Sequence, residues 1–271
     1  MAVALAEAYQ ITHNSIYLSR AEQTEAFVLS GEDSAGGGGI YFQEGVTTSK
    51  NAISTLQGAR AAAMLYEDTG QTAYLTDAEQ LVTWADTHIQ ESNGLFYQTY
   101  DLATNSPQGI PLVNAAGIGI SANLALYDAT GDTSYLTEAQ LIGNTALTQF
   151  FDPGTDAMKP EGYWSFELVD GLDLLYEHDH NPVWLDNVAS TLDYLEADRE
   201  DSNGHYGTLW ERGGVQTTVL PSWNLIDQAS VDEAYLFTST VPEPAGTIVI
   251  TLGLSALLLH RGLPTRQRST R

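Results

Sequence analysis

The sequence predicts an all-α fold built from antiparallel helical hairpins, and three observations carry this prediction. A thirteen-residue phrase recurs without insertion at residues 9–21, 66–78 and 127–139, and a fourth, eroded copy starts at residue 176. Each copy contains the residues of a tight turn between two helices. Apolar residues at helical spacing flank the copies. Such a repeat indicates stacked units, because each unit can bury its apolar face only against its neighbours.

The turn in each phrase is predicted from the residue four positions after the first tyrosine. This residue is Gly70 or Gly131 in two copies, and glycine just past a helix end closes the helix in the left-handed conformation. His13 and His180 stand there in the other copies, and histidine is among the non-glycine residues enriched in that conformation. The residues that come next are Asn14, Gln71, Asp132 and Asn181. Asn and Asp are favoured caps for the second helix.

The helices before the turns differ in composition from those after them. Residues 59–63 and 115–122 are rich in alanine and glycine, whereas bulkier residues such as Leu81, Trp84 and Phe150 follow the turns. Small-faced helices can approach one another closely, so we expect them to form an inner ring and the bulkier helices an outer one. The long connections then gather at the end opposite the turns, near residues 30–48, 91–111, 151–164 and 198–214. Long loops on a rigid scaffold are commonly functional.

Composition narrows the range of functions. The 271 residues include no cysteine, which excludes disulfides and thiolate metal sites. A formal charge of −25 argues against a nucleic-acid partner. The fourth connection is not an EF-hand, because Arg199 stands at the first ligand position. His178 and His180 lack a third ligand nearby in sequence, so we expect no metal and no cofactor.

The C-terminal segment differs from the rest of the chain. Residues 241–244 read Val-Pro-Glu-Pro, residues 245–259 are uncharged and mostly apolar, and arginines follow. This three-part pattern resembles the PEP-CTERM sorting signal of exported bacterial proteins. The resemblance implies export to the cell envelope or medium and exosortase-type sorting machinery as a partner. It also implies a helix at 245–259 that enters the inner membrane before processing. We therefore expect a domain at 1–240 and a sorting segment at 241–271.

The N-terminal residues do not resemble a signal peptide. They contain no basic region, no separate apolar core and no small-residue cleavage site. Met1 instead falls within the inner helix of the first hairpin. Because an export tag calls for an entry signal, we expect the natural gene to contain further coding sequence upstream.

Candidate binding residues lie in the long connections. The glycine run of the first is followed by Tyr41 and Phe42, and flexible surface loops seldom end in two aromatics. Asp101 in the second is either an acceptor for a sugar hydroxyl or the first residue of a turn. Glu167 and Asp170, on the inner helix after the third, could act as acid or base, although an exposed role is commoner. Further aromatic residues are Tyr97, Tyr163, Trp164, Tyr206 and Trp210.

Several of these motifs resemble glycoside hydrolase family 76 over residues 1–237. The glycine-aromatic loop at 37–42, the pair Lys50-Asn51, the pair Tyr100-Asp101 and the repeated hairpins carry the resemblance. It implies an (α/α)6 toroid that acts on α-1,6-mannan or related polysaccharides. Together with the connection aromatics, it makes the following residues the expected substrate-binding set: Gly38, Gly39, Tyr41, Phe42, Asn51, Tyr100, Asp101, Asn114 and Tyr163.

The chain departs from the family pattern in two places. Where the family has Tyr-Asn-Gln-Gly, residues 114–117 read Asn-Ala-Ala-Gly, so an amide pair expected to contact sugar is absent. The adjacent aspartates that serve the family as nucleophile and acid/base would fall a few residues before Met1. By the same comparison the first hairpin of the toroid is missing. We therefore expect no catalytic residue in this chain and no activity from it as it stands.

Two other functions remain open. The loss of the amide pair also fits a non-catalytic carbohydrate-binding relative of the family. Another toroid enzyme, such as a sugar epimerase or an unsaturated glucuronyl hydrolase, would require catalytic histidines or carboxylates within the present connections.

Overall fold

The computed structural model describes residues 1–155, 157–160, 162–210 and 219–238. All of them belong to one compact unit, Met1–Thr238, whereas the second unit, Ser239–Arg271, lies outside the described residues. The predicted domain boundary at residue 240 and the sorting segment stay predictions. None of the described helices is long and apolar enough to cross a bilayer, and the expected membrane helix at 245–259 is not among the residues described.

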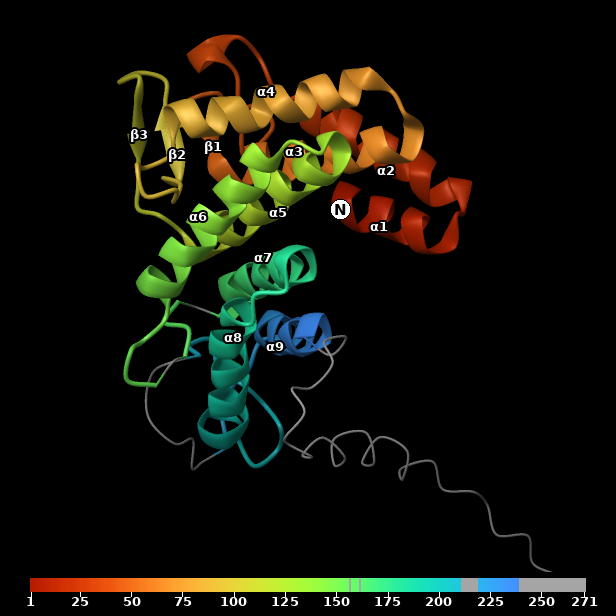
Figure 1. Ribbon diagram of the computed structural model, residues 1–271. Helices are drawn as coiled ribbons and strands as arrows, with labels where there is room; N and C mark the ends of the chain where they lie inside the picture. Colours follow the sequence, from red (N-terminus) through yellow and green to blue (C-terminus); the bar gives the residue numbers. More distant parts are fainter. Residues whose placement is uncertain (156, 161, 211–218, 239–271) are drawn as a thin grey trace, which may run out of the picture. The chain divides into compact units, whose positions relative to one another are not determined.

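The described residues are mainly helical, which confirms the all-α class (Figure 1). The hairpins are α1 (Ala2–Thr12) with α2 (Ser15–Leu29), α3 (Ala52–Thr69) with α4 (Thr72–His88), α5 (Val113–Thr130) with α6 (Thr133–Phe150), and α7 (Gly162–Asp179) with α8 (Val183–Tyr194). The helix α9 (Leu225–Thr238) packs against α7, and short helical turns lie at Ala35–Gly37 and Leu195–Arg199.

The turns between the paired helices lie where the repeated phrase predicts them. The residues predicted to be left-handed have φ values of 52° at His13, 69° at Gly70, 72° at Gly131 and 53° at His180. Their N–H groups donate to the carbonyl of the first tyrosine of each phrase, at 2.7 or 2.8 Å. This bond satisfies one of the carbonyl groups that a helix end leaves without an intrahelical partner.

The alanine- and glycine-rich helices form an inner row, as predicted. Helix α5 packs against both α3 and α7, α7 packs against α9, and α1 packs against α3. A Cβ atom on Gly117 of α5 would overlap the carbonyl oxygen of Glu167 on α7, so glycine permits this close approach. Near the other end of the two helices, His178 Nε2 lies 2.9 Å from Asp128 Oδ1, which shows that α5 and α7 run parallel.

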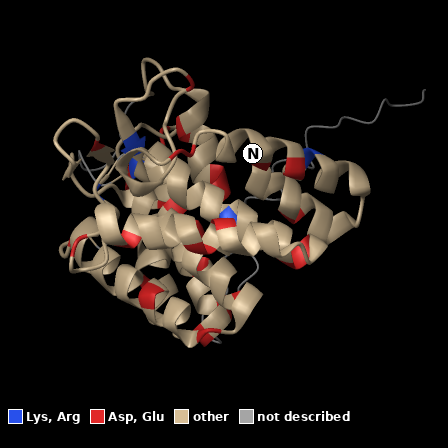
Figure 2. Cartoon of the chain, turned by 90° about the horizontal axis from the view of Figure 1, so that it is seen from above, with Lys and Arg blue, Asp and Glu red and all other residues tan. Residues whose placement is uncertain are grey.

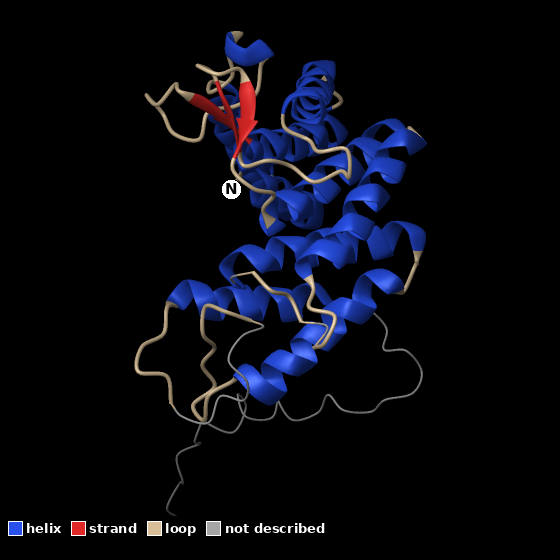
Figure 3. Cartoon of the chain, turned by 90° about the vertical axis from the view of Figure 1, so that its left-hand side faces the viewer, coloured by secondary structure: helices blue, strands red, loops and turns tan. Residues whose placement is uncertain are grey.

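The long connections therefore lie together at the starts of the inner helices, which we call the connector end; the short turns lie at the turn end. Connections one and two join in a small antiparallel sheet of β1 (Ser49–Asn51), β2 (Thr99–Asp101) and β3 (Ser106–Gln108), drawn red in Figure 3. Connections three and four meet where Gly162 N donates to Thr208 O at 2.8 Å.

Acidic side chains far outnumber basic ones in this chain, with 35 Asp and Glu against 10 Lys and Arg, and Figure 2 shows their spread over the helices. Two of the basic residues, Lys50 and Arg60, are nevertheless buried. Each of them is held by carboxylates, as burial of a charge requires. Both lie in or just before α3, next to the site described below.

Candidate functional site

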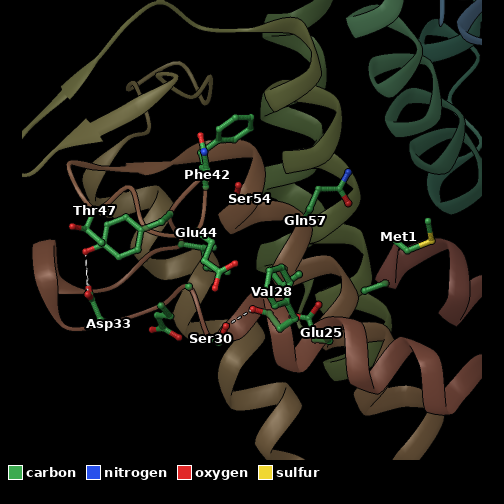
Figure 4. Close-up of a pocket in the computed structure, with 18 of the residues that line it drawn as sticks. Met1, Glu25, Val28, Ser30, Asp33, Phe42, Glu44, Thr47, Ser54 and Gln57 are labelled. Carbon is green, nitrogen blue, oxygen red and sulfur yellow. Dashed lines mark hydrogen bonds between the residues drawn. The ribbon is translucent and has the colours of Figure 1, made fainter. Parts of the chain in front are cut away.

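A cavity of about 550 Å³ opens at the connector end, beside the first two hairpins. Its walls come from the start of α1, the last turns of α2, the first connection and the first turns of α3, as the close-up in Figure 4 shows. Apolar side chains and polar groups both line it: Val3, Phe27, Val28, Ile40, Tyr41 and Phe42 among the former, and Glu25, Glu32, Asp33, Glu44, Ser54 and Gln57 among the latter. This volume suits a small-molecule ligand.

Lys50 anchors the first connection to α3. Its side chain is fully buried, its Nζ lies 2.8 Å from Asp33 Oδ1, and it stands 3.5 Å from the centre of the Tyr41 ring. The Tyr41 hydroxyl donates to the same carboxylate at 3.0 Å. The hydrogen bond from Lys50 lowers the pKa of Asp33, so this carboxyl group stays charged near neutral pH. This contact fixes the position of Tyr41 and leaves the Phe42 side chain 74% exposed at the cavity mouth.

The glycine run lets the connection lie against an outer helix. Gly38 and Gly39 are buried with φ values of 130° and 75°, and a Cβ on Gly39 would lie 2.8 Å from atoms of the Trp84 ring. The Trp84 indole N–H donates to Gly36 O at 2.8 Å. Packing against Trp84 thus explains these glycines structurally. A role for Gly38 and Gly39 in substrate binding stays a prediction.

Glu25 contributes a buried carboxyl group to the cavity wall. It belongs to α2, its side chain is completely buried, and neither of its carboxyl oxygens has a hydrogen-bond partner. Burial, with a smaller contribution from the Asp77 charge, raises its pKa to about 8. Glu25 is therefore mostly protonated near neutral pH and can both donate and accept a hydrogen bond.

A second cluster of polar side chains lies between the inner helices. Arg60 of α3 donates to Asp170 of α7 at 2.6 Å and to Glu7 of α1 at 3.0 Å. Gln57, which lines the cavity, donates to Glu167 at 3.4 Å. Burial, followed by the charge of Asp170, raises the pKa of Glu167 to about 7, a value suited to proton transfer. Of the two carboxylates singled out in the sequence, Asp170 is an ion-pair partner and Glu167 has the perturbed pKa.

The two predicted asparagines have structural roles. Asn51 caps α3, because its side-chain oxygen accepts from Ser54 N at 3.0 Å, and its amide reaches Gln98 O at 3.4 Å. Asn114 is buried, and its side-chain oxygen accepts from Ala115 N at 3.0 Å. Neither residue lines the cavity, and their contact with substrate stays a prediction.

The pair Tyr100 and Asp101 lies away from the cavity. Tyr100 packs edge-on against Trp84 and His88, at 6.0 and 5.3 Å between ring centres. Asp101 accepts from the N–H and hydroxyl groups of Thr104, both at 2.8 Å. Of its two roles left open by the sequence, the structure therefore shows the turn; a sugar contact stays a prediction.

The connection aromatics are only partly available to a ligand. Tyr163 is half-buried at the start of α7, 4.8 Å from the ring of Trp164. Tyr97 is also half-buried. Trp210 is completely buried and packs against Gly162, where a Cβ would overlap its indole. Trp210 is therefore not available to a ligand, although the sequence places it among the connection aromatics.

Tyr41 and Phe42 are thus the members of the predicted set that line the cavity. Sequence reasoning missed Glu25 and Gln57, because both sit within regular helices where Glu and Gln are ordinary surface residues. Only the position of Gln57, three residues after Ser54 on an inner helix, could have indicated a ligand-facing role. Within the described part of the chain, no group of three or more His, Asp or Glu residues is placed to hold a metal ion.

The sequence model of glycosyl hydrolase family 76 matches residues 1–165. A family 76 α-mannanase from Bacteroides thetaiotaomicron is similar in structure, with 30% identity and a TM-score of 0.79; the match covers 88% of this chain and 66% of that one. A second family 76 structure from a strain of that species has 22% identity and a TM-score of 0.77, with 89% and 55% covered. A search of curated proteins finds no match.

Two further solved structures are similar to the chain in fold. An inactive variant of an α-1,6-mannanase from Salegentibacter sp., with two neighbouring aspartates replaced, was solved with α-1,6-mannotriose; identity is 22%, the TM-score 0.77, and 87% and 74% of the chains are covered. A cellobiose 2-epimerase from Bacillus thermoamylovorans has 14% identity and a TM-score of 0.61, with 86% and 69% covered. These similarities confirm the predicted toroid fold. The matches cover only part of the length of those proteins.

Proposed function

Because the chain belongs to glycosyl hydrolase family 76, we propose that it carries the sugar-binding face of a glycoside hydrolase that acts on α-mannan-type polysaccharide. The observation that carries this proposal is the 30% identity to an α-mannanase over 88% of the chain. The chain spans only 66% of that enzyme, so the activity of the whole protein is part of the proposal.

The cavity at the connector end supports this function. It combines an exposed aromatic ring at its mouth, Phe42, with apolar walls and with the carboxyl and amide groups of Glu25 and Gln57. Sugars have apolar C–H faces and hydroxyl groups on the same ring, and such a mixture of surfaces complements both. We place one end of the glycan against Phe42 and the next sugar unit within the cavity.

We further propose that the 271-residue chain binds this glycan without hydrolysing it. A retaining glycosidase needs two carboxyl groups ~5–5.5 Å apart across the scissile bond. The sequence contains no two adjacent aspartates, and the two inner-row carboxylates singled out in the sequence, Glu167 and Asp170, are engaged with Gln57 and Arg60. Of the functions left open by the sequence, carbohydrate binding without hydrolysis is therefore the one that we propose for this chain.

Calorimetric titration with α-1,6-mannotriose tests the proposal. We expect binding by the full chain, about tenfold weaker binding by Phe42→Ala, and unchanged binding by Ile11→Ala, which removes an exposed side chain at the turn end. Incubation with α-1,6-mannan should release no sugar. Failure to bind any mannooligosaccharide would contradict the mannan-type function, and release of mannose would contradict the non-hydrolytic role.

An epimerase or glucuronyl hydrolase activity is less well supported. Those chemistries call for histidines or carboxylates at the site; carboxylates line the cavity, but no histidine is among its described lining residues. His13, His178 and His180 lie at the turn end, while His88 stacks on Trp84 at the outer helix α4. The epimerase likeness, at 14% identity, concerns the fold alone.

We also propose that the protein is exported to the cell envelope or medium by exosortase-type machinery, with residues 245–259 entering the membrane before processing. The support for this is the Val-Pro-Glu-Pro, apolar and arginine pattern of residues 241–271. Fractionation of the producing cells is the test, and retention of the protein in the cytoplasm would overturn the proposal.

A further inference from the structure

The carboxyl group of Glu25 makes no hydrogen bond among the described residues. Both of its oxygens are buried and neither has a hydrogen-bond partner. The described residues that line the cavity include no Lys, Arg or His. The amino group of Met1 is near enough to act against the rise in the pKa of Glu25, but neither carboxyl oxygen has it as a hydrogen-bond partner. A buried polar group without a partner destabilises the folded state. Such a group calls for an explanation, and a ligand that supplies the missing hydrogen bonds is one.

The position of Glu25 points to a ligand in the cavity. It lies on the last turns of α2, four residues before Leu29, and lines the cavity together with Val28 of the same helix. Figure 4 draws Glu25, Val28 and Gln57 around the same hollow. The carboxyl group of Glu25 is thus a fully buried polar element of a wall that contains both apolar and polar residues.

We propose that Glu25 is a ligand-binding residue that holds hydroxyl groups of one hexopyranose unit inside this cavity. The inference rests on the proposed function, since it gives the glycan a subsite. The cavity of about 550 Å³ accommodates a single sugar ring with room for its neighbour. Val3, Val28 and Ile40 provide the apolar wall that faces the C–H groups of the ring.

The protonation state of Glu25 suits a neutral ligand. Burial first, and then the charge of Asp77 on α4, raise its pKa to about 8, while the amino group of Met1 on α1 acts in the opposite direction. Tyr74 of α4 also faces Glu25, and burial, followed by charges that include Glu25, raises its pKa. The neutral carboxyl group presents one donor and an acceptor to a pair of sugar hydroxyls.

Two substitutions separate ligand binding from a structural role. Glu25→Gln keeps a donor and an acceptor in the same volume, so its affinity for methyl α-mannopyranoside and α-1,6-mannotriose should stay within about threefold of the wild type. Glu25→Leu removes both, so its affinity should fall about tenfold. Its thermal midpoint should stay equal or rise, because a partnerless buried carboxyl group is removed. Glu22→Leu, one turn earlier on α2 and outside the cavity, is the control and should bind like the wild type.

The outcomes distinguish this inference from the proposed function. Equal mannotriose affinity in wild type and Glu25→Leu overturns the role of Glu25 and leaves the proposed function standing. The wild type could instead bind methyl α-glucopyranoside or methyl α-galactopyranoside but no mannoside. If Glu25→Leu also loses that binding, the result supports the subsite and overturns the mannan-type function. Glucosamine that binds more tightly than the neutral sugars and is lost in Glu25→Gln shows a carboxylate–ammonium site, which overturns the neutral-ligand inference. No binding of any probe overturns both.

Discussion

The two ends of the helical hairpins are stabilised in different ways. At the turn end, four turns share one geometry: a left-handed residue donates its N–H to the carbonyl of a tyrosine four positions earlier, at 2.7 or 2.8 Å each time. All the groups that form this bond belong to one short segment of chain. The turn end is therefore the same in every hairpin, whatever the hairpin packs against.

At the connector end, the contacts that hold the first and fourth connections differ from one another. Lys50 anchors the first. In the fourth, Asp201 accepts from the N–H groups of Asn203, His205 and Leu220, at 2.8, 3.0 and 2.9 Å. Burial alone would raise the pKa of Asp201, but these bonds outweigh it and lower the pKa to about 2. The end that varies is also the end that contains the cavity. Local repetition thus provides the scaffold, and individual tertiary contacts provide the site.

The largest effect is expected where the inner helices meet near the connector end. Gly117→Ala would place a methyl group on the carbonyl oxygen of Glu167, a backbone atom that cannot move without shifting α7. We expect a loss of about 3 kcal/mol in the free energy of unfolding, measured by urea denaturation with tryptophan fluorescence.

Gly131→Ala is the matched control at the turn end. A Cβ there meets no neighbouring atom, so only the left-handed backbone at φ 72° opposes it. The expected cost is about 1 kcal/mol. Equal losses in the two variants would show that the packing of the inner row and the turn geometry contribute equally to the free energy of unfolding. That result would contradict the expected difference between the two ends.

Buried carboxyl groups should also make the stability of the fold depend on pH. Burial raises the pKa values of four carboxyl groups, to about 8 for Glu25 and about 7 for Asp86, Glu167 and Asp173. Between roughly pH 5 and 8 the folded state keeps protons that the unfolded state releases. The free energy of unfolding should therefore fall as pH rises, by up to about 1 kcal/mol per pH unit for one such group. Urea denaturation at pH 5, 6.5 and 8 measures this slope.

Glu25→Gln tests how much of that slope comes from one residue. The amide does not titrate, so the variant should lose less stability than the wild type between pH 5 and 8. Asp132 at the turn end has the opposite sign: the N–H of Ser134 lowers its pKa, so its contribution is lost only as pH falls through that lowered pKa. Parallel stability curves for the variant and the wild type would show that Glu25 is not protonated in the folded state.

The difference between the ends also explains what could be predicted from the sequence. The turns and the hairpin order could be predicted, because tyrosine, glycine or histidine, and cap residues recur at fixed spacing. The pairing of β1 with β2 was not predicted, because it joins Lys50 to Tyr100 across distant segments of the chain. The burial of Trp210 was not predicted, because a buried and an exposed indole look alike in sequence. Glu25 was missed for the same reason: nothing near it in the chain signals its burial.

The smallest effect is expected within the repeated turn, at the one place where its copies differ in capping. Asn14 and Asp132 each accept a hydrogen bond from a backbone N–H of the helix that follows, whereas the Gln71 side chain makes no such bond. Gln71→Asn should therefore supply the missing cap to α4 and raise the free energy of unfolding by about 0.5–1 kcal/mol.

The reciprocal change, Asp132→Gln, should remove the cap from α6 and lower the free energy of unfolding by a similar amount. Gln71 now donates to Glu22 at 3.3 Å on the exposed surface, a contact whose loss costs little because both groups stay hydrated. Thermal midpoints measured for both variants would show whether the capping residue alone sets the stability of each turn. A gain in one and a loss in the other means that the turns are interchangeable units set by their own residues. A loss in Asp132→Gln without a gain in Gln71→Asn means that the α3–α4 turn depends on its contact with α2. The stability of the turn end would then depend on contacts between hairpins as well as on the residues of each turn.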